Sequence, residues 1–370
     1  MAEILFISKP LAPPWNDSGK NLVRDVAGGL TRHRAHAMGT GEDIPGLETV
    51  KLENIYPKTL RGFSLSRRMQ ARVFARLVFG RRYDLWHFFF APNLQSSMAS
   101  SAIRRMRGVP AVHTISSAPH PGANLKACLF ADVHVVLSRH TEARLVEAHV
   151  QADRIVRIPP GILSLDLPHA EERRQCRAYL GISPSRPVVL YAGDLEFGDG
   201  AEMCMRAVAT LAASLDVQLV IASRMKTAQA VQCESRLREL AKDLGITHAV
   251  SWVGEVPDMR QTLLASDVLV LSSQTLYAKM DYPLVVLEAM SLERAVILAH
   301  GTPAAELAQE GGAIAIEPNS DALTAAISAL IEDDAYRRSL GEAARQLVLN
   351  KYDRATMAKS YEALYDRLLR

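Results

Sequence analysis

The chain is predicted to form two α/β domains, each built on a doubly wound parallel sheet. Short apolar runs alternate with stretches of helical pattern along the sequence, which is the pattern of repeated strand–helix units. The alternation stops once, at 158–162, where two prolines and a glycine form a non-helical joint. A length of 370 residues is sufficient for two separate cores.

The N-terminal domain is expected to span residues 1–160. Its strands are continuous apolar runs without alternation, as is typical of parallel strands buried on both faces. The runs that indicate strands lie at 4–8, 84–90, 110–116 and 133–138. Each is followed by a segment able to form a helix, and right-handed crossovers then give a doubly wound sheet.

The C-terminal domain is expected to span residues 161–352. A short charged helix near 170–180 precedes six further apolar runs, at 187–194, 217–223, 249–254, 268–273, 295–299 and 313–317. A last helix over 353–370 carries an apolar and aromatic stripe at helical spacing, which includes Met357, Tyr361 and Tyr365. This stripe predicts that the helix packs on a core.

The composition indicates a globular cytoplasmic protein. Hydrophobic residues make up 48% of the chain and charged residues 22%, and no apolar run reaches the length of a membrane span. The first ten residues read as a strand rather than a signal peptide. The four cysteines form no CxxC pair, which argues against a disulfide framework and against a zinc site. No metal site is expected.

The charge is distributed unevenly between the two halves. Residues 1–160 hold 22 Lys and Arg against 12 Asp and Glu, while the remainder holds 21 against 28. The segment 59–82 contains seven arginines, no acid and an apolar stripe, a pattern compatible with a basic helix that lies on an anionic membrane, at its inner face. A core-packed helix with solvated arginines is the alternative. No motif indicates nucleic acid.

A helix that opens at Pro283 is the strongest sign of a binding site. It follows the strand at 268–273, and ligands of open α/β sheets lie beyond the carboxyl ends of the strands. Proline suits the first turn, and the free N–H groups near Leu284 and Val285 favour phosphate. Glu288, in the second turn, is placed to accept hydrogen bonds from ribose hydroxyls; a solvated surface glutamate is the alternative.

The segment PLVVLEAMSLERAVILAHGTPAAEL (283–307) resembles the donor-site region of retaining glycosyltransferases of family four, which have the GT-B fold. The similarity extends along the chain: 7–27 resembles the first strand, loop and helix of the acceptor-side domain. The segment 249–273, with Gly254 and Val256, resembles the part that receives the nucleotide base. The helix 353–370 resembles the one that crosses back to the first domain. The resemblance implies two Rossmann-like domains facing across a cleft.

The family resemblance implies transfer of a sugar from a nucleoside diphosphate sugar, with retained anomeric configuration and without metal or other cofactor. The diphosphate leaving group needs positive charge nearby. The family's Arg and Lys, in the loop after Gly193, fall on Asp194 and Asp199 here, and the first glutamate of its pair falls on Met280.

Other cations are therefore expected at the donor site. Arg224 and Lys226 follow the second C-terminal strand, at the sheet edge where Gly193 lies, and Lys279 precedes Met280. We expect Arg224→Ala and Lys226→Ala to reduce turnover far more than stability. A solvated basic loop is the alternative.

On the acceptor side, the segment Ser18, Gly19 and Lys20 lies between the first strand and the first helix, and its glycine allows close approach of a ligand. Three further residues are candidates for catalysis by the resemblance. They are Asp17, His113 and His120.

Two other functions remain open from the sequence. One is a non-catalytic GT-B protein that binds a sugar nucleotide or a partner protein through a decayed site. The other is a sugar-nucleotide 2-epimerase, which shares the fold. The base and sugar of the donor and the identity of the acceptor, expected to be anionic or lipid-linked, are not predicted further.

Overall fold

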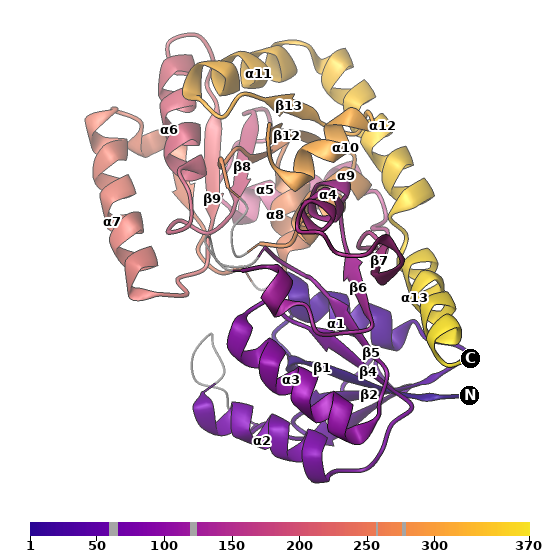
Figure 1. The fold of residues 1–370 in the computed structure, drawn as a ribbon. Coiled ribbons are helices and arrows are strands. Elements are labelled where there is room, and N and C mark those ends of the chain that lie inside the picture. Colours follow the sequence, from indigo (N-terminus) through magenta and orange to yellow (C-terminus); the bar gives the residue numbers. More distant parts are fainter. Residues whose placement is uncertain (59–65, 119–123, 257, 276–278) are drawn as a thin grey trace. The chain divides into compact units, whose positions relative to one another are not determined.

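The computed structural model describes residues 1–58, 66–118, 124–256, 258–275 and 279–370. The chain divides into two compact units. Unit 1 comprises Met1–Ile162, Tyr277–Tyr282 and Tyr352–Arg370, and unit 2 comprises Leu163–Leu276 and Pro283–Lys351. Each unit is built on one parallel sheet (Figure 1). Among the described residues, no helix is long and apolar enough to cross a bilayer.

Unit 1 has a seven-stranded sheet in the order β3-β2-β1-β4-β5-β6-β7. Its strands are β1 (Glu3–Leu11), β2 (Arg34–Gly39), β3 (Val50–Asn54), β4 (Leu85–Phe89), β5 (Ala111–Thr114), β6 (Val133–Val136) and β7 (Ile155–Arg157). Its helices are α1 (Ser18–Gly28), α2 (Arg67–Phe79), α3 (Leu94–Arg107), α4 (Arg139–Glu147) and α13 (Arg354–Leu368), with short 3-10 turns at Lys126–Cys128 and Ala152–Arg154.

Unit 2 has a six-stranded sheet in the order β10-β9-β8-β11-β12-β13. Its strands are β8 (Val188–Ala192), β9 (Gln218–Ala222), β10 (Val250–Trp252), β11 (Val268–Leu271), β12 (Ala295–Ala299) and β13 (Ile314–Ile316). Its helices are α5 (Ala170–Tyr179), α6 (Gly200–Leu211), α7 (Ala228–Asp243), α8 (Met259–Ala265), α9 (Leu284–Ser291), α10 (Glu306–Gln309), α11 (Ser320–Glu332) and α12 (Asp334–Lys351), with 3-10 turns at Thr247–Ala249 and Pro303–Ala305.

The ten strands predicted from apolar runs are all present, which confirms the fold class. Three strands were missed, namely β2, β3 and β7. The edge strands β3 (VKLEN) and β7 (IVR) are short and partly polar, because an edge strand buries less of its surface. β2 begins with the exposed Arg34 and contains His36, so its apolar run is interrupted.

Two layers of helices cover the sheet of unit 2. In one layer, α6 packs against α7 and α11; in the other, α5 contacts α8, and α9 contacts α8 and α12. The strands β8, β9, β11 and β12, which are apolar apart from Gln218 and the hydroxyl of Tyr191, are fully buried between these layers. This sandwich leaves the two ends of the strands as the places where polar loops gather.

The last helix, α13, is anchored in unit 1 by a buried polar network. The Tyr365 hydroxyl lies 2.6 Å from Nδ1 of His87, and Nε2 of His87 lies 2.8 Å from Oγ1 of Thr114. The same Oγ1 lies 3.2 Å from the Tyr361 hydroxyl. Tyr361 and Tyr365 are completely buried, so the predicted packing stripe is confirmed.

Candidate functional site

The strand order of unit 2 reverses between β8 and β11. From β8 the chain moves outward to β9 and β10, and from β11 it moves the other way to β12 and β13. A doubly wound sheet binds its ligand beyond the carboxyl ends of the strands at such a reversal. Here that place is bordered by Gly193 and Asp194 after β8 and by Ser272 and Ser273 after β11.

The loop after β8 is held tightly against the strand ends by its glycines. The hydroxyl of Tyr191, a fully buried side chain whose pKa is raised by burial, donates to the backbone carbonyl of Asp194 at 3.1 Å. A Cβ on Gly193 would lie 2.7 Å from that hydroxyl, and one on Gly200 would lie 2.5 Å from Oγ of Ser273. Only glycine fits either position, so the loop backbone is fixed at the reversal point.

A buried ion pair joins this loop to the loop after β9. Nζ of Lys226 lies 2.5 Å from Oδ1 of Asp194, and the two side chains are 12% and 6% exposed. From the sequence, a carboxylate at position 194 was expected to repel the diphosphate of a donor. The pair neutralises Asp194, which removes much of that repulsion. Asp199 lies on the exposed surface before α6.

Helix α9 begins at the same edge of the sheet, because it follows the carboxyl end of β11. Pro283 occupies its cap position and the helix proper begins at Leu284, one residue later than expected. Leu284 is buried, whereas Val285 and Glu288 are half-buried. An α-helix leaves its first N–H groups without intrahelical partners, so this end is suited to an anion.

The remaining C-terminal candidates divide between the units. Arg224 follows β9, and Gly254 and Val256 follow β10; all three are half-buried and lie in loops at the carboxyl edge of the unit 2 sheet. Gly254 has a φ of +59°, which favours glycine. Lys279 is half-buried and belongs to unit 1.

The acceptor-side segment lies at the corresponding reversal of unit 1, between β1 and β4. Asp17 caps α1 by accepting from the backbone N–H of Lys20 at 3.1 Å, and it pairs with Lys9 at 2.9 Å. Nζ of Lys20 donates to the carbonyl of Ala12 at 2.6 Å. Ser18 and Gly19 form the start of α1 and are half-buried.

The histidine candidates have different outcomes. His113 is completely buried on β5, with Nε2 3.0 Å from the carbonyl of Phe90, and burial lowers its pKa to about 4. It packs against Phe90 and Phe130, so substrate cannot reach it in this arrangement, and its proposed catalytic role is disfavoured. His120 lies outside the described residues.

Sequence reasoning missed several residues that shape the site. Tyr191 and Ser273 position the loop after β8, and only the glycine spacing of DLEFGDG signalled them. Asp281 was also missed. Its buried carboxylate accepts from Oγ of Ser138 and Oγ1 of Thr141, both at 2.6 Å, which fixes the segment before Pro283 to the start of α4 within unit 1.

The described part of the chain holds no group of three or more His, Cys, Asp or Glu side chains placed to bind a metal ion. At the carboxyl edge of the unit 2 sheet, Lys226 pairs with Asp194, and Arg224 lies in the same loop as Lys226.

Comparisons with known proteins agree with this architecture. Residues 172–347 match the family model for glycosyl transferases group 1. A GDP-mannose-dependent alpha-(1-6)-phosphatidylinositol monomannoside mannosyltransferase of Mycolicibacterium smegmatis is 26% identical over 60% of this chain and 59% of its own length. A D-inositol 3-phosphate glycosyltransferase 1 of Catenulispora acidiphila is 28% identical over 71% and 68%. The chain spans between 44% and 68% of the length of the curated relatives it matches.

Solved structures share the fold over the full length. Anabaena Alr3699/HepE in complex with UDP-glucose has a TM-score of 0.81 at 18% identity, with 100% of both chains covered. WaaG, a glycosyltransferase involved in lipopolysaccharide biosynthesis, has a TM-score of 0.65 at 16% identity and covers 99% of each chain. With two parallel-sheet α/β units, the chain has the GT-B fold, and its similarity to group 1 glycosyltransferases over residues 172–347 supports a glycosyltransferase of the family-four type.

Proposed function

We propose that the chain transfers a sugar from a nucleoside diphosphate sugar to an acceptor hydroxyl, and that unit 2 binds the donor where β8 and β11 diverge. The observation that carries the proposal is the buried Lys226–Asp194 pair at this edge of the sheet. It places an ammonium group beside the Gly193 loop, at the edge where α9 begins. Support also comes from the names of the solved relatives, which include UDP and UDP-glucose complexes.

In this proposal each group has a distinct role toward the donor. Glu288 accepts hydrogen bonds from the ribose hydroxyls, while the first turn of α9 and Lys226 face the diphosphate. The bond between the anomeric carbon and the diphosphate oxygen breaks as the acceptor oxygen bonds to that carbon, and the acceptor proton leaves on the departing phosphate. The helix end offsets part of the charge that develops there, and the Lys226–Asp194 pair keeps the Asp194 carboxylate from opposing it. We propose that the configuration is retained and that no metal is required.

Asp17, Ser18, Gly19 and Lys20 are proposed to contact the acceptor. They lie at the strand-order reversal of unit 1, where a ligand of this kind of sheet is expected. The names of two curated relatives contain phosphorylated inositols. A phosphate-bearing acceptor would suit the excess of Lys and Arg in residues 1–160.

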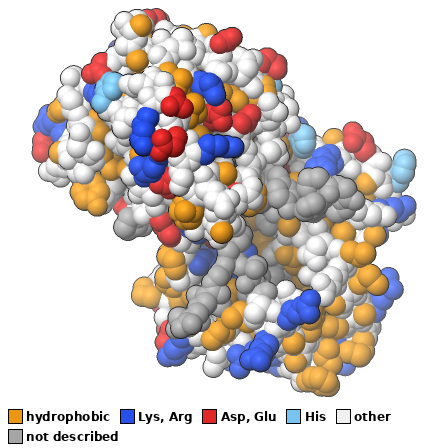
Figure 2. Space-filling view, turned by 90° about the vertical axis from the view of Figure 1, so that its left-hand side faces the viewer, with side chains coloured by type: hydrophobic (Ala, Val, Ile, Leu, Met, Phe, Trp, Pro, Cys, Tyr) orange, Lys and Arg blue, Asp and Glu red, His pale blue; other side chains and the backbone are white. Residues whose placement is uncertain are grey.

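We further propose that unit 1 contacts an anionic membrane through α2 and α3, which pack together. Residues 54–131 hold twelve Lys and Arg and one acid, Asp84. Large apolar side chains on these helices face solvent: Phe79 is 85% exposed, Met98 62% and Met106 64%. Figure 2 shows orange and blue side chains together over the lower body, with few red ones. Of the basic segment 59–82, residues 66–82 lie within the described chain.

Vesicle co-sedimentation tests the membrane contact. Binding should rise with the fraction of acidic lipid and fall with salt, because exposed charges are screened. Phe79→Ser with Arg72→Gln should weaken binding, whereas Arg236→Gln, an exposed arginine of α7 in unit 2, serves as a control and should not. If the fraction of protein bound to vesicles changes neither with lipid charge nor with salt concentration, the proposed membrane contact is wrong.

The donor site is tested by calorimetric titration with a panel of nucleoside diphosphates. Glu288→Gln should weaken the binding of the preferred nucleotide by about 1–3 kcal/mol, the range for hydrogen bonds to a charged group. Glu239→Gln, on the exposed face of α7, is the matched control and should bind as the wild type does. Equal affinity in both variants would rule out the role given to Glu288.

A further inference from the structure

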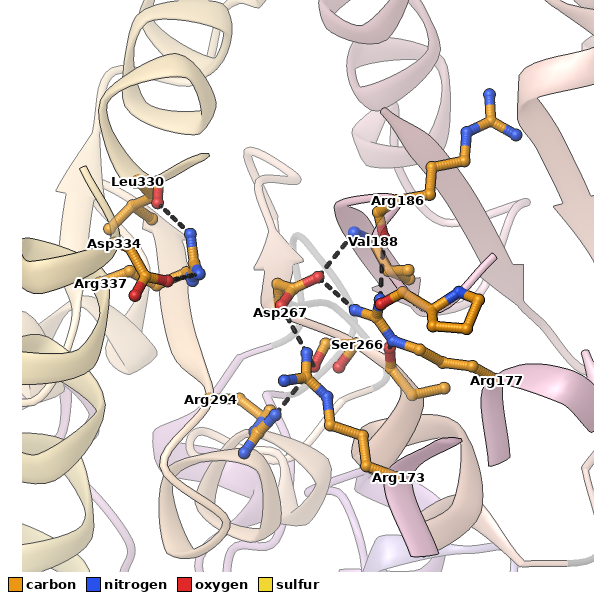
Figure 3. Close-up of polar contacts among 12 residues, drawn as sticks. Arg173, Arg177, Arg186, Val188, Ser266, Asp267, Arg294, Leu330, Asp334 and Arg337 are labelled. Carbon is orange, nitrogen blue, oxygen red and sulfur yellow. Dashed lines mark hydrogen bonds and ion pairs between the residues drawn. The ribbon is translucent and has the colours of Figure 1, made fainter. Parts of the chain in front are cut away.

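A cluster of arginines lies at the opposite edge of the unit 2 sheet from the donor site. Arg173 and Arg177 come from α5, one turn apart, and Arg294 precedes β12. All three converge on the turn that contains Ser266 and Asp267, just before β11 (Figure 3). This edge carries the amino ends of the strands, whereas Asp194 and Lys226 lie beyond the carboxyl ends.

One part of the cluster is a complete structural pair. Arg177 donates to the carbonyls of Ala265, Pro184 and Arg186 at 2.6–3.0 Å and to Oδ2 of Asp267 at 2.7 Å. The same Oδ2 accepts from the backbone N–H of Val188 at 2.8 Å. Asp267 thus ties α5 to the starts of β8 and β11, and its Oδ2 is fully used.

Arg173 and Arg294 have fewer hydrogen-bond acceptors around their guanidinium groups than Arg177 has. Arg173 reaches Oδ1 of Asp267 at 2.5 Å, and it shares the carbonyl of Ser266 with Arg294, at 3.5 Å and 3.1 Å. Arg294 is otherwise bonded to the carbonyl of Leu292 at 2.9 Å. Nε of Arg173 is buried and has no hydrogen-bond partner among the described residues. Two guanidinium groups that share one carbonyl repel each other.

The charge balance within the described residues is positive. Three guanidinium groups lie around the single carboxylate of Asp267, and the carboxylate of Glu293 also acts on Arg294. Three positive charges against two negative charges leave an excess of one positive charge. Arg337, on the neighbouring α12, pairs with its own Asp334. Burial, followed by the charge of Arg173, lowers the pKa of Arg294 to about 10, so it remains protonated at neutral pH.

We propose that Arg173 and Arg294 bind a phosphate-type oxyanion at this amino-terminal edge of unit 2. A planar guanidinium fork suits phosphate oxygens in a bidentate arrangement, and an anion at the exposed part of the Arg173 guanidinium would balance the excess positive charge. The Arg173 side chain is 33% exposed, so an anion can reach it from solvent. The site is separate from the donor site and does not depend on the proposed transferase activity.

Thermal unfolding at constant ionic strength, with phosphate replacing chloride, tests the site. Phosphate should raise the melting temperature of the wild type, and Arg173→Gln should weaken the apparent affinity for phosphate at least tenfold. Arg174→Gln is the matched control, because Arg174 is the next residue on α5, is exposed and pairs with Glu171. Any phosphate bound at the donor site contributes equally to both variants.

A second arm separates the two sources of the anion. Glycerol 3-phosphate is compared with inorganic phosphate in the same assay. If both compounds stabilise the protein and both effects need Arg173, the site accepts the phosphoryl group of a metabolite. If only inorganic phosphate stabilises the protein, the site binds the free ion. Should Arg173→Gln fail to fold, Arg294→Lys provides the comparison, since it keeps the charge and loses the fork. Equal phosphate stabilisation in the Arg173 and Arg174 variants would overturn the proposal.

Discussion

Replacing Lys226 by methionine should destabilise unit 2, because it removes the ammonium group that pairs with the buried Asp194 carboxylate. The two side chains are 12% and 6% exposed, and the Nζ–Oδ1 distance is 2.5 Å. Breaking such a buried pair by removing one partner costs about 3–5 kcal/mol. For a domain of this size, each kcal/mol lowers the melting temperature by about 2–4 °C. The structure therefore revises the expectation that Lys226→Ala would affect turnover far more than stability.

Urea denaturation, followed by circular dichroism, measures this cost directly. Lys242→Met is the matched control, since Lys242 is 61% exposed and pairs with Glu239 on the surface of α7. Its loss should cost less than about 1 kcal/mol. The double variant Asp194→Asn/Lys226→Met should regain most of the lost stability without regaining turnover. Equal stability of the two single methionine variants would refute the reasoning.

Three further predictions concern the same framework. Arg224→Ala should reduce turnover with little change in stability, since Arg224 is half-buried in a loop; an unchanged kcat/KM would exclude it from the donor site. Gly200→Ala should cost about 1–3 kcal/mol of unfolding free energy, because its Cβ would lie 2.5 Å from Oγ of Ser273; Gly200→Ala with Ser273→Gly should recover part of that loss. Unit 1 should lose stability between pH 6.5 and 5, because burial lowers the pKa of His113 to about 4 and of His134 to about 2. Over that interval the unfolded chain takes up protons and the folded chain does not, so each histidine costs about 2 kcal/mol. A urea midpoint that is the same at pH 7 and pH 5 would contradict this.

The sequence predicted the core of each sheet well, because parallel strands buried on both faces are continuous apolar runs. β8 and β12, read as PVVLYAGD and AVILA, differ from the structure by two residues or fewer at either end. The strands β3 and β7 were missed for the converse reason: they lie at sheet edges and mix polar with apolar residues.

Sequence reasoning predicted the positions of candidate-site residues only where the order of the strands determines at which edge of the sheet a loop lies. Lys226 and Asp194 follow neighbouring strands, so their common edge could be foreseen, but their direct pairing could not. The pairing depends on how Tyr191 and the tightly packed glycines hold the loop after β8, and no sequence pattern predicts that loop conformation. His113 illustrates the opposite case, since a strand position does not reveal which face of the sheet is open, and this one is filled by Phe90 and Phe130.

Nuclear magnetic resonance of the protein incubated with nucleoside diphosphate sugars, in the presence of a chelator, tests the central claim most directly. The account predicts slow release of the nucleoside diphosphate from a preferred donor, with a first-formed sugar product that keeps the donor's anomeric configuration. It also predicts that the release persists in Glu239→Gln and is reduced in Glu288→Gln. Binding of no nucleoside diphosphate sugar, or equal release by both variants, would contradict a donor site on unit 2 at the divergence of β8 and β11.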